Sequence, residues 1–491
     1  MINKIEPQTF SQFFKKNKNQ YELDFVDIPI NNGDIPLFID PYAISKRSDK
    51  WSIECHNLIV DFFQEVVDLI KDGQKKRAIY MLSGLREPNQ IHFGLSRGSI
   101  ARGRGVGSIQ ALSLYKGLEE SSAVKTGFLK NIEDCELLID GIGRDKISDI
   151  TTNIIKKHLI EYTKYQCVLF NIPVHQVSSG SLWDAEQGKW TNDYVNLPIC
   201  NDESIILVPK MIARFDMVFN HQEYYRHFVL NFLQAEHLNA NSSLVRTLKD
   251  GTKKEPTKKS LKEVYPLSKT YLYDFSKEHP EVFESYKKEK AKIFNSILNE
   301  TSNEDITSLI EEKEFDFNNL IKKFAEIPTG NKTATDFHNH IKGVLTAIFY
   351  PYLVNPIKEK EIHKGRKRID LCYDNAAKNG FFIHLVINKQ VPAPYVFMEC
   401  KNYKDDPQNP ELDQLSGRFS KIRGRFGFLI CRKFNNKDLF IERCKDTAKD
   451  DRGFILPLDD EDLITLLEYK RDKNEKGIND FLEERYKKLV M

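Results

Sequence analysis

The clearest alternation of apolar and polar positions in the chain lies within residues 365–432. Residues 395–401 alternate well enough to predict a strand between two polar segments. Because side chains alternate between the two faces of a strand, Phe397, Glu399 and Lys401 share one face and the residues between them share the other. The pattern therefore predicts a carboxylate and an ammonium group close together at the end of a mostly apolar strand.

The segments on either side extend this pattern into a small α/β unit. The expected elements are a helix over 333–350, a strand that includes Asp370, an additional strand over 381–387, a helix over 410–420 and a strand over 424–432. Asp370 is a lone carboxylate among apolar residues, as Glu399 is. The order predicts two strands with one acidic residue each, followed by a helix and another strand.

The remainder of the chain predicts a mixed α/β protein. The expected strands lie at 22–29, 35–40, 135–140, 205–209 and 214–219, and the expected helices at 57–72, 108–117, 145–168, 224–233 and 464–490. Residues 1–240 form an expected N-terminal α/β domain, 241–330 a basic linker and helical connector, and 331–491 a C-terminal domain with a charged helix at its end.

Composition limits the function classes. The 73 basic and 71 acidic residues give a net charge of only +2, so nucleic-acid binding would depend on local basic patches. Eight cysteines without a Cys-x-x-Cys pair predict free, buried thiols in a reducing compartment. The chain has no apolar run of membrane-spanning length and no signal peptide, so we expect a cytoplasmic protein without a membrane partner.

The isolated acidic residues and the adjacent lysine predict a metal site. Burying Glu399 alone is costly, so it needs Lys401 or a bound cation. Carboxylate oxygens suit Mg²⁺, for which Mn²⁺ can substitute, and a nearby lysine can hold or deprotonate an attacking water. Glu-x-Lys also occurs at 311–313 and 468–470, but in charged, helix-like surroundings typical of solvated surfaces.

The predicted order is a strand with Asp370, a strand with Glu399 and Lys401, a helix with Gln414 and a further strand. Over residues 330–460 this order resembles the core of the PD-(D/E)XK nuclease superfamily and its restriction-endonuclease-like branches. The resemblance implies an αβββαβ domain that hydrolyses phosphodiester bonds in nucleic acid, DNA rather than RNA. It implies that Asp370 and Glu399 bind the metal, that Lys401 is catalytic, and that Gln414 faces the site from its helix.

Two features depart from the family pattern. The helix over 333–350 offers Asp336, His338 and His340 where many members have a further acid, so that role stays unassigned. The two acidic strand residues are also 29 positions apart, long enough for the additional strand over 381–387.

Basic residues near these motifs are candidates for nucleic-acid contact. Arg366, Lys367 and Arg368 lead into Asp370, and Arg418 shares a helix face with Gln414, so all four are expected near a phosphate backbone. The segments around these residues also resemble a family of large uncharacterised bacterial proteins of phage-defence islands, which implies a role in antiviral defence.

The N-terminal half contains one glycine- and arginine-rich segment, residues 94–107. The segment holds five glycines together with Arg97, Arg102 and Arg104, so backbone N–H groups and guanidinium groups could together contact phosphate or nucleic acid. The alternative is a basic loop before the next helix. Further on, three aspartates around a predicted strand end could form a second site, or simply serve the turn and the helix start: Asp140, Asp145 and Asp149.

Two function classes follow. In the first, the chain is a Mg²⁺-dependent nuclease whose N-terminal half recognises a target, a partner protein, a second copy of the chain or an activating signal. In the second, the nuclease-like domain only binds, and the protein is a nucleic-acid or partner adaptor. Retention of Asp370, Glu399 and Lys401 together favours the enzyme.

Overall fold

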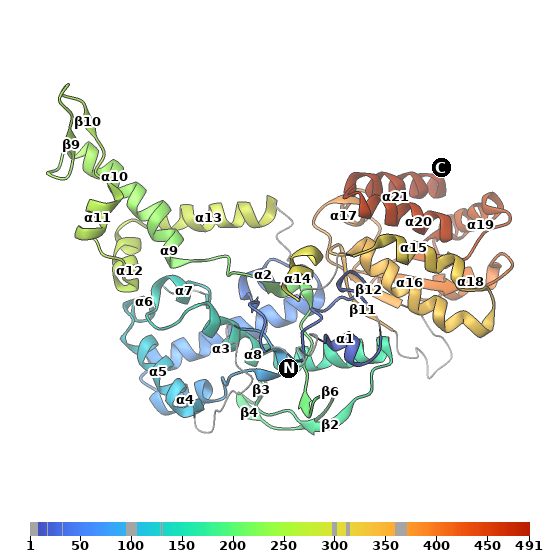
Figure 1. Cartoon of the computed structure of the whole chain (residues 1–491), viewed down its shortest axis with the longest axis horizontal. Helices are drawn as coiled ribbons and strands as arrows, with labels where there is room; N and C mark the ends of the chain where they lie inside the picture. Colours follow the sequence, from blue (N-terminus) through green and yellow to red (C-terminus); the bar gives the residue numbers. More distant parts are fainter. Residues whose placement is uncertain are drawn as a thin grey trace, which may run out of the picture.

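The computed structural model describes residues 8–16, 18–31, 33–94, 106–127, 129, 131–296, 302–310, 315–358 and 371–491. Figure 1 shows an N-terminal half built mainly of helices and a C-terminal half built around one sheet, with a helical arm that projects from the N-terminal half. The protein is a mixed α/β fold, as the sequence predicted.

The C-terminal sheet has five strands in the order β11-β12-β13-β14-β15. Its strands are β11 (Leu353–Ile357), β12 (Leu371–Asn375), β13 (Tyr395–Lys401), β14 (Phe426–Cys431) and β15 (Phe454–Leu458). β11, β12 and β13 pair antiparallel, whereas β13, β14 and β15 run parallel. Parallel neighbours need a crossover, which α18 (Asn409–Ser416) and α19 (Lys437–Lys449) provide.

Helix α16 (Ala334–Phe349) precedes this sheet, so the chain order is α16, β11, β12, β13, α18, β14, with β15 added at the edge. The αβββαβ class agrees with the prediction, but its first strand, β11, was not among the expected elements. One difference is that 381–387 is a helix, α17 (Gly380–Ile387), rather than a strand. Short apolar runs do not distinguish helix from strand. Here Phe381 donates its N–H to Asn479 Oδ1 at 2.7 Å, and the helix buries one side against the C-terminal helix.

The two faces of the sheet pack into different cores. Met398 of β13 belongs to the large core that runs through most of the protein. Phe397, its neighbour, belongs to a smaller core with Leu412 of α18, Leu429 of β14 and Phe440 of α19. The alternation predicted for 395–401 is therefore confirmed, and it places Glu399 on the face covered by α18 and α19.

The C-terminal end holds two helices, α20 (Asp460–Arg471) and α21 (Glu475–Val490), where one was expected over 464–490. The break falls at Lys473, whose φ of 54° lies in the left-handed region and cannot continue a right-handed helix. α20 contacts α16, and α21 contacts α17, so these helices cover the large-core face of the sheet.

The N-terminal half is organised around one long helix, α8 (Arg144–Phe170), which contacts α3 and several strands. The elements before it are α1 (Phe10–Phe13), η1 (Gln20–Glu22), β1 (Phe38–Ile39), α2 (Pro41–Ser45), α3 (Lys50–Lys71), α4 (Lys75–Ser83), η2 (Asn89–Ile91), α5 (Val106–Glu120), α6 (Ser122–Lys125) and α7 (Asp134–Leu138). After it come β2 (His175–Ser178), β3 (Leu182–Asp184), β4 (Lys189–Thr191), β5 (Tyr194–Leu197), β6 (Ile199–Cys200), β7 (Glu203–Ser204), η3 (Lys210–Ile212) and β8 (Ala213–Arg214). The strands of the N-terminal half form two-stranded sheets.

The helices expected at 57–72, 108–117 and 145–168 are confirmed, but the strand expected at 135–140 is wrong. That segment begins with helix α7, because Asp134 and Cys135 bond back to residues three earlier. Segments 22–29 and 205–209 are extended but pair through single bridges, such as Phe25 with Pro209, rather than through a ladder.

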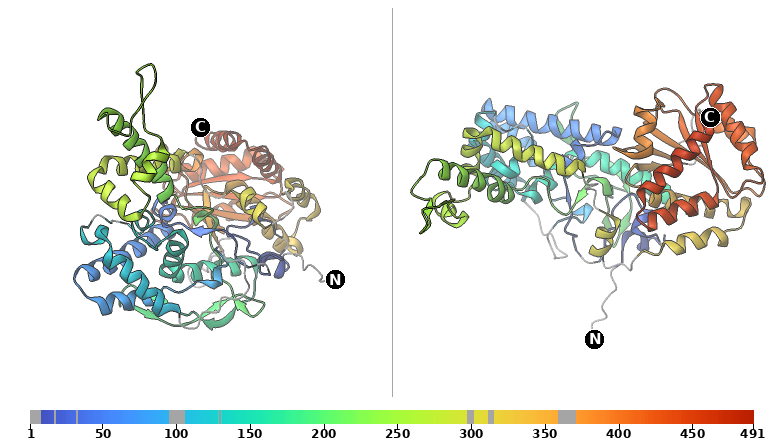
Figure 2. Two further views of the ribbon diagram at one scale, coloured as in Figure 1. Left: turned by 60° about the vertical axis from the view of Figure 1, so that its left-hand side comes forward. Right: turned by 90° about the horizontal axis from the view of Figure 1, so that it is seen from above.

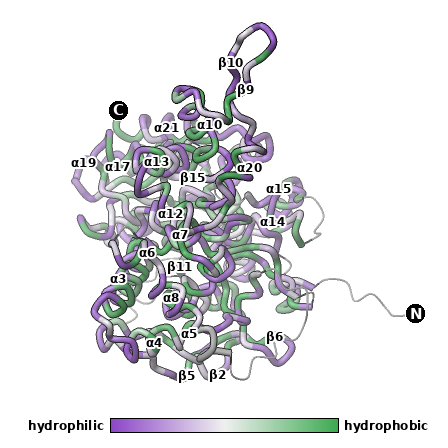
Figure 3. The backbone as a smooth tube through the Cα atoms, turned by 90° about the vertical axis from the view of Figure 1, so that its left-hand side faces the viewer, coloured by the Kyte–Doolittle hydropathy of each residue, from purple (hydrophilic) through white to green (hydrophobic). Residues whose placement is uncertain are grey.

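The arm consists of α9 (His221–Glu223), η4 (Tyr224–Val229, a π-helix), α10 (Leu230–Asn239), the hairpin β9 (Arg246–Thr247) and β10 (Lys253–Lys254), α11 (Lys258–Val264), α12 (Lys269–Glu278) and α13 (Pro280–Ser296). The hairpin carries the basic segment 249–259 away from the body (Figures 2 and 3). α14 (Asn303–Leu309), α15 (Phe317–Glu326) and η5 (Asn331–Thr333) then lead to α16.

The two halves share the large core, so the domain limits at 240 and 330 stay a prediction. All eight cysteines are free, and seven are buried. Among the described helices, none combines the length and the apolar character needed to cross a membrane.

A buried polar cluster joins the halves where α8 meets β11. Asp24 accepts hydrogen bonds from Tyr162 Oη at 2.8 Å and from the N–H of Asn355 at 3.2 Å, and Asn355 Nδ2 donates to Asp374 at 2.9 Å. Burial raises the pKa of Asp24 to about 6 and that of Asp374 to about 7. Two carboxyl groups at the junction therefore become charged only near neutral pH.

This cluster predicts a pH-dependent stability. The pKa of Asp374 rises from 3.8 to about 7 on folding, so its favourable contribution exists at low pH and is lost as the pH rises toward 7. The variant Asp374→Asn stays neutral at both pH values, so it does not lose this contribution. The difference in free energy of unfolding, variant minus wild type, should therefore be about 1–3 kcal/mol larger at pH 8 than at pH 5. Denaturant unfolding at both pH values measures this difference, and equal differences at the two pH values would contradict it.

Candidate active site

Glu399 and Lys401 lie at the end of β13, in the middle of the sheet. Lys401 Nζ is 2.7 Å from Glu399 Oε1, and both side chains point to the face that α18 covers. Glu399 is 1% exposed, whereas the Lys401 side chain is 15% exposed. The pair therefore combines a fully buried carboxylate with an amine that reaches the surface.

Arg418 approaches the same carboxylate from the other side. Its NH1 lies 2.5 Å from Glu399 Oε2, and the guanidinium is as buried as the carboxylate. Within the described part of the chain, Arg418 Nε and NH2 have no hydrogen-bond partner. The sequence suggested a surface contact to nucleic acid for this residue. Instead the structure places it inside, because the buried Glu399 needs a second cation.

Gln414 comes from α18, one turn before Arg418. Its Oε1 lies 3.5 Å from Lys401 Nζ, the outer limit of a hydrogen bond. Its neighbour Asp413 points the other way and pairs with Arg452 at 2.7 Å. Residues four apart share a helix face. α18 therefore brings Gln414 to the lysine, and the turn directly after this helix brings Arg418 to the carboxylate of the same pair.

Helix α16 supplies His338 rather than an acid. His338 Nε2 lies 3.1 Å from the carbonyl oxygen of Cys400, the residue between Glu399 and Lys401. The ring of His340 packs against that of Phe324, with the ring centres 4.6 Å apart. Burial lowers the pKa of His340 to about 3, so this histidine is neutral. Asp336 is exposed. His338 thus contacts the strand of the candidate site directly.

The end of β13 is fixed by a contact that the sequence did not reveal. Asn402, which follows Lys401, donates from Nδ2 to the carbonyls of Pro328 and Gly330 at 3.1 and 2.9 Å. Arg432 NH1 donates to Asn402 Oδ1 at 3.1 Å and to the carbonyl of Ile327 at 2.5 Å. Asparagine in a polar run reads as an ordinary turn residue, so only the fold identifies this role.

Several predicted site residues lie outside the described residues: Asp370, Arg366, Lys367, Arg368, Arg97, Arg102 and Arg104. Asp370 is adjacent in sequence to Leu371, whose partner across the sheet is Met398, the residue before Glu399. Among the described residues, no three His, Cys, Asp or Glu side chains are grouped so that they could hold a metal ion.

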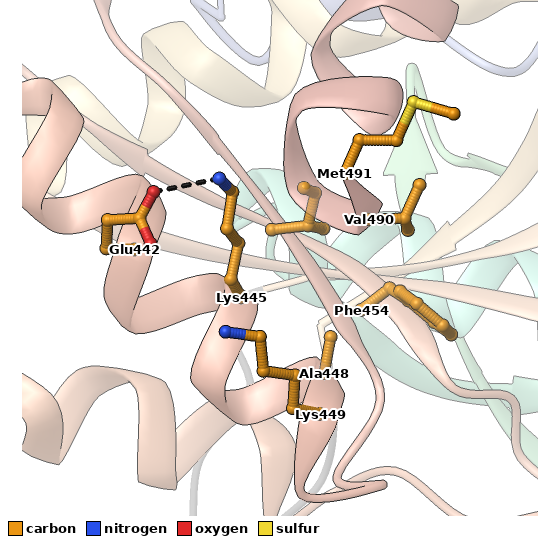
Figure 4. Close-up of a pocket in the computed structure, with 8 residues that line it drawn as sticks. Glu442, Lys445, Ala448, Lys449, Phe454, Val490 and Met491 are labelled. Atoms are coloured by element: carbon orange, nitrogen blue, oxygen red, sulfur yellow. Dashed lines mark hydrogen bonds and ion pairs between the residues drawn. The ribbon is translucent and has the colours of Figure 1, made fainter.

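Two of the pockets formed by the described residues lie in the C-terminal half. One, of about 350 Å³, lies beyond the end of β13 and is lined in part by Asn402 and Tyr403. The other, of about 330 Å³, lies where α19 meets the end of α21, beside Lys449 and Met491 (Figure 4). None of the predicted site residues lines the second pocket.

The three candidate aspartates of the N-terminal half, Asp140, Asp145 and Asp149, lie at two separate positions. Asp149 lies near Asp145, Asp34 and Glu87, and burial followed by these like charges raises its pKa to about 8. Asp140 instead accepts a hydrogen bond from Thr270 Oγ1 at 3.4 Å. The expected gathering of all three aspartates is therefore only partial.

The position of Arg418 predicts a strong effect on stability. Arg418→Met removes one of the two cations beside the buried Glu399, which should lower the free energy of unfolding by about 3 kcal/mol. The double variant Arg418→Met, Glu399→Gln removes both charges and should recover much of this loss. Denaturant unfolding of both variants measures the coupling. A single variant as stable as wild type would place Arg418 at the surface instead.

Comparisons with known proteins reach only the N-terminal half. A family model described as a domain of unknown function (DUF8370) matches residues 16–220, which ends where the arm begins. No curated protein matches the chain, and no solved structure matches it. The matched segment, from the region of η1 to the start of α9, is thus similar to a family without an assigned function, and it does not include the site at β13.

Proposed function

We propose that the protein is a metal-dependent nuclease that hydrolyses phosphodiester bonds in DNA. The observation that carries this proposal is the convergence on β13 of a buried carboxylate, Glu399, with an amine that reaches the surface, Lys401, and an amide, Gln414. They lie on an αβββαβ framework whose order is that of the nuclease superfamily the sequence resembles.

The metal in this proposal is Mg²⁺, with Mn²⁺ as a substitute. Glu399 offers the hard oxygen atoms that Mg²⁺ prefers. Its two oxygens are paired with Lys401 and Arg418, so Mg²⁺ would have to replace one of these partners to bind the carboxylate. Asp370 is the proposed second ligand, on the basis of its place in the sequence. When bound, Mg²⁺ would supply positive charge to the phosphate as negative charge builds on it during hydrolysis.

The residues of the chain have separate roles in this proposal. Lys401 Nζ orients the attacking water and takes up or releases its proton. Gln414 Oε1 accepts a hydrogen bond from Lys401 and so limits the directions in which the amine points. Arg418 keeps Oε2 of Glu399 engaged, which fixes the carboxylate plane relative to the lysine.

Recognition of the substrate completes the proposal. Arg366, Lys367 and Arg368 precede Asp370 in the sequence and would contact the DNA backbone without reading bases. The N-terminal half would add contacts to the DNA backbone through Arg97, Arg102 and Arg104. The same half would also bind a target, a partner protein or a second copy of the chain. The proposed setting, antiviral defence in the bacterial cytoplasm, rests on the sequence resemblance alone.

The central prediction concerns the acidic residues and the lysine. Asp370→Ala, Glu399→Gln and Lys401→Ala should each lower the rate of DNA cleavage by about 100-fold or more, because each removes a metal ligand or the group that handles the water. EDTA should abolish cleavage. Gel assays with linear, supercoiled and single-stranded DNA, and with RNA, measure these effects.

The matched control for these variants is Glu468→Gln, at the exposed glutamate of the Glu-x-Lys in α20, which should cleave as wild type does. Wild-type rates in all three site variants would overturn the proposal. Binding without cleavage under every metal condition would favour the adaptor.

Gln414 gives a second, graded prediction. Gln414→Ala removes the hydrogen-bond acceptor of Lys401 and should reduce cleavage by about 10- to 100-fold, with the melting temperature nearly unchanged because Gln414 is half-buried. Asp413→Asn is the control, since Asp413 faces Arg452 and not the site. Single-turnover kinetics at low Mg²⁺ compare the variants, and equal activity of Gln414→Ala and wild type would remove Gln414 from the site.

A further inference from the structure

The pocket beyond β13 adjoins the candidate active site directly. Lys401 Nζ lies 5.9 Å from the centre of the Tyr403 ring, and Tyr403 lines the pocket. The pocket is also lined by Glu411, one helical turn before Gln414 on α18, and Gln414 contacts the same lysine. A molecule in the pocket would therefore lie next to whatever Lys401 holds.

The lining of this pocket suits an uncharged ring with amino groups. Tyr403 presents a ring that is 39% exposed, and aromatic rings are the usual platforms on which nucleobases stack. Two of the three acids of the lining are held by hydrogen bonds: Asp406 accepts the N–H groups of Asn435 and Asn436 at 2.6 and 2.9 Å, and Glu411 accepts that of Gln408 at 2.8 Å.

Fixed carboxylates decide which part of a nucleotide can enter. They repel a phosphate, but they accept hydrogen bonds from the exocyclic amino groups of bases. The volume of about 350 Å³ lies at the small end of the range of ligand sites, which is ~300–1,000 Å³. Lys404, at the exposed rim, can contact the phosphate that stays outside.

We propose that this pocket takes one unstacked base of a DNA strand, the base of the nucleotide next to the phosphate held at Lys401. The position of that phosphate rests on the proposed function. A base inside a continuous duplex is stacked on both faces and cannot present one to Tyr403 without being extruded. The substrate class is therefore single-stranded DNA, or duplex DNA with an unpaired nucleotide at the cut.

Binding without catalysis tests this assignment. Wild type, Tyr403→Ala and Tyr403→Phe are titrated in EDTA, and again with Ca²⁺, against a single-stranded DNA oligonucleotide that contains 2-aminopurine and against its blunt duplex. Tyr403→Ala should bind the single strand about 5- to 100-fold more weakly, because base–aromatic stacking is lost. Tyr403→Phe keeps the ring and should bind as wild type does, with the same quenching of 2-aminopurine. Duplex affinity should be equal in all three proteins, and thermal melting confirms that each is folded.

The outcomes separate this inference from the proposed function. Tyr403-dependent binding of the single strand without cleavage in Mg²⁺ would keep the pocket and remove the nuclease. Cleavage by wild type with unchanged single-strand binding in Tyr403→Ala would keep the nuclease and remove the pocket. Equal losses on single strand and duplex, or no binding of either DNA by wild type, would overturn the pocket assignment. Preference for an RNA strand of the same sequence would overturn the choice of DNA.

Discussion

The candidate site depends on one buried carboxylate, Glu399, held between two cations. A lone ionised carboxylate in this position would carry a large desolvation cost, and neither the strand nor the helices could pack around it. Lys401 from the same strand and Arg418 from the end of α18 compensate the charge from opposite sides. Leu412 and Leu415 pack α18 against the same face of the sheet, and Gln414 on this helix lies beside Lys401.

The same requirement connects the site to the rest of the protein. Asn402 follows Lys401 directly and is hydrogen-bonded to the segment that ends α15, while Arg432 also contacts the carbonyl of Phe324 in that helix. On the N-terminal side, the Tyr21 ring stacks on Phe315 at 4.4 Å, close to the start of α15. A continuous set of contacts therefore runs from the N-terminal half through α15 to the end of β13.

The junction between the halves has a different character. Where α8 meets β11, the contacts are polar and buried, and two of their members are carboxyl groups whose pKa values lie near neutrality. A large shared apolar core surrounds them. The halves thus form one packed body, although the family match on the N-terminal side ends at residue 220.

The sequence by itself determined the local features of the site. The two-residue period of the strand Tyr395–Lys401 placed Glu399 and Lys401 on one face, and helical spacing put Gln414 and Asp413 on different sides of α18. These patterns are local, since they depend on the two-residue and 3.6-residue periods of the backbone. The same reasoning predicted the long helices α3 and α8.

Only the tertiary structure decided what depends on distant residues. Segment 381–387 is apolar at nearly every position, so its helix was selected by packing against α21 and by the bond from Phe381 to Asn479. Arg418 is a surface residue by its charge alone, and it is buried because Glu399, nineteen positions earlier, needs its guanidinium. Arg432 likewise acquires its role from a partner in α15, and Asn402 from partners in the segment after that helix. Long-range partners carry no periodic signal, so the fold alone determines them.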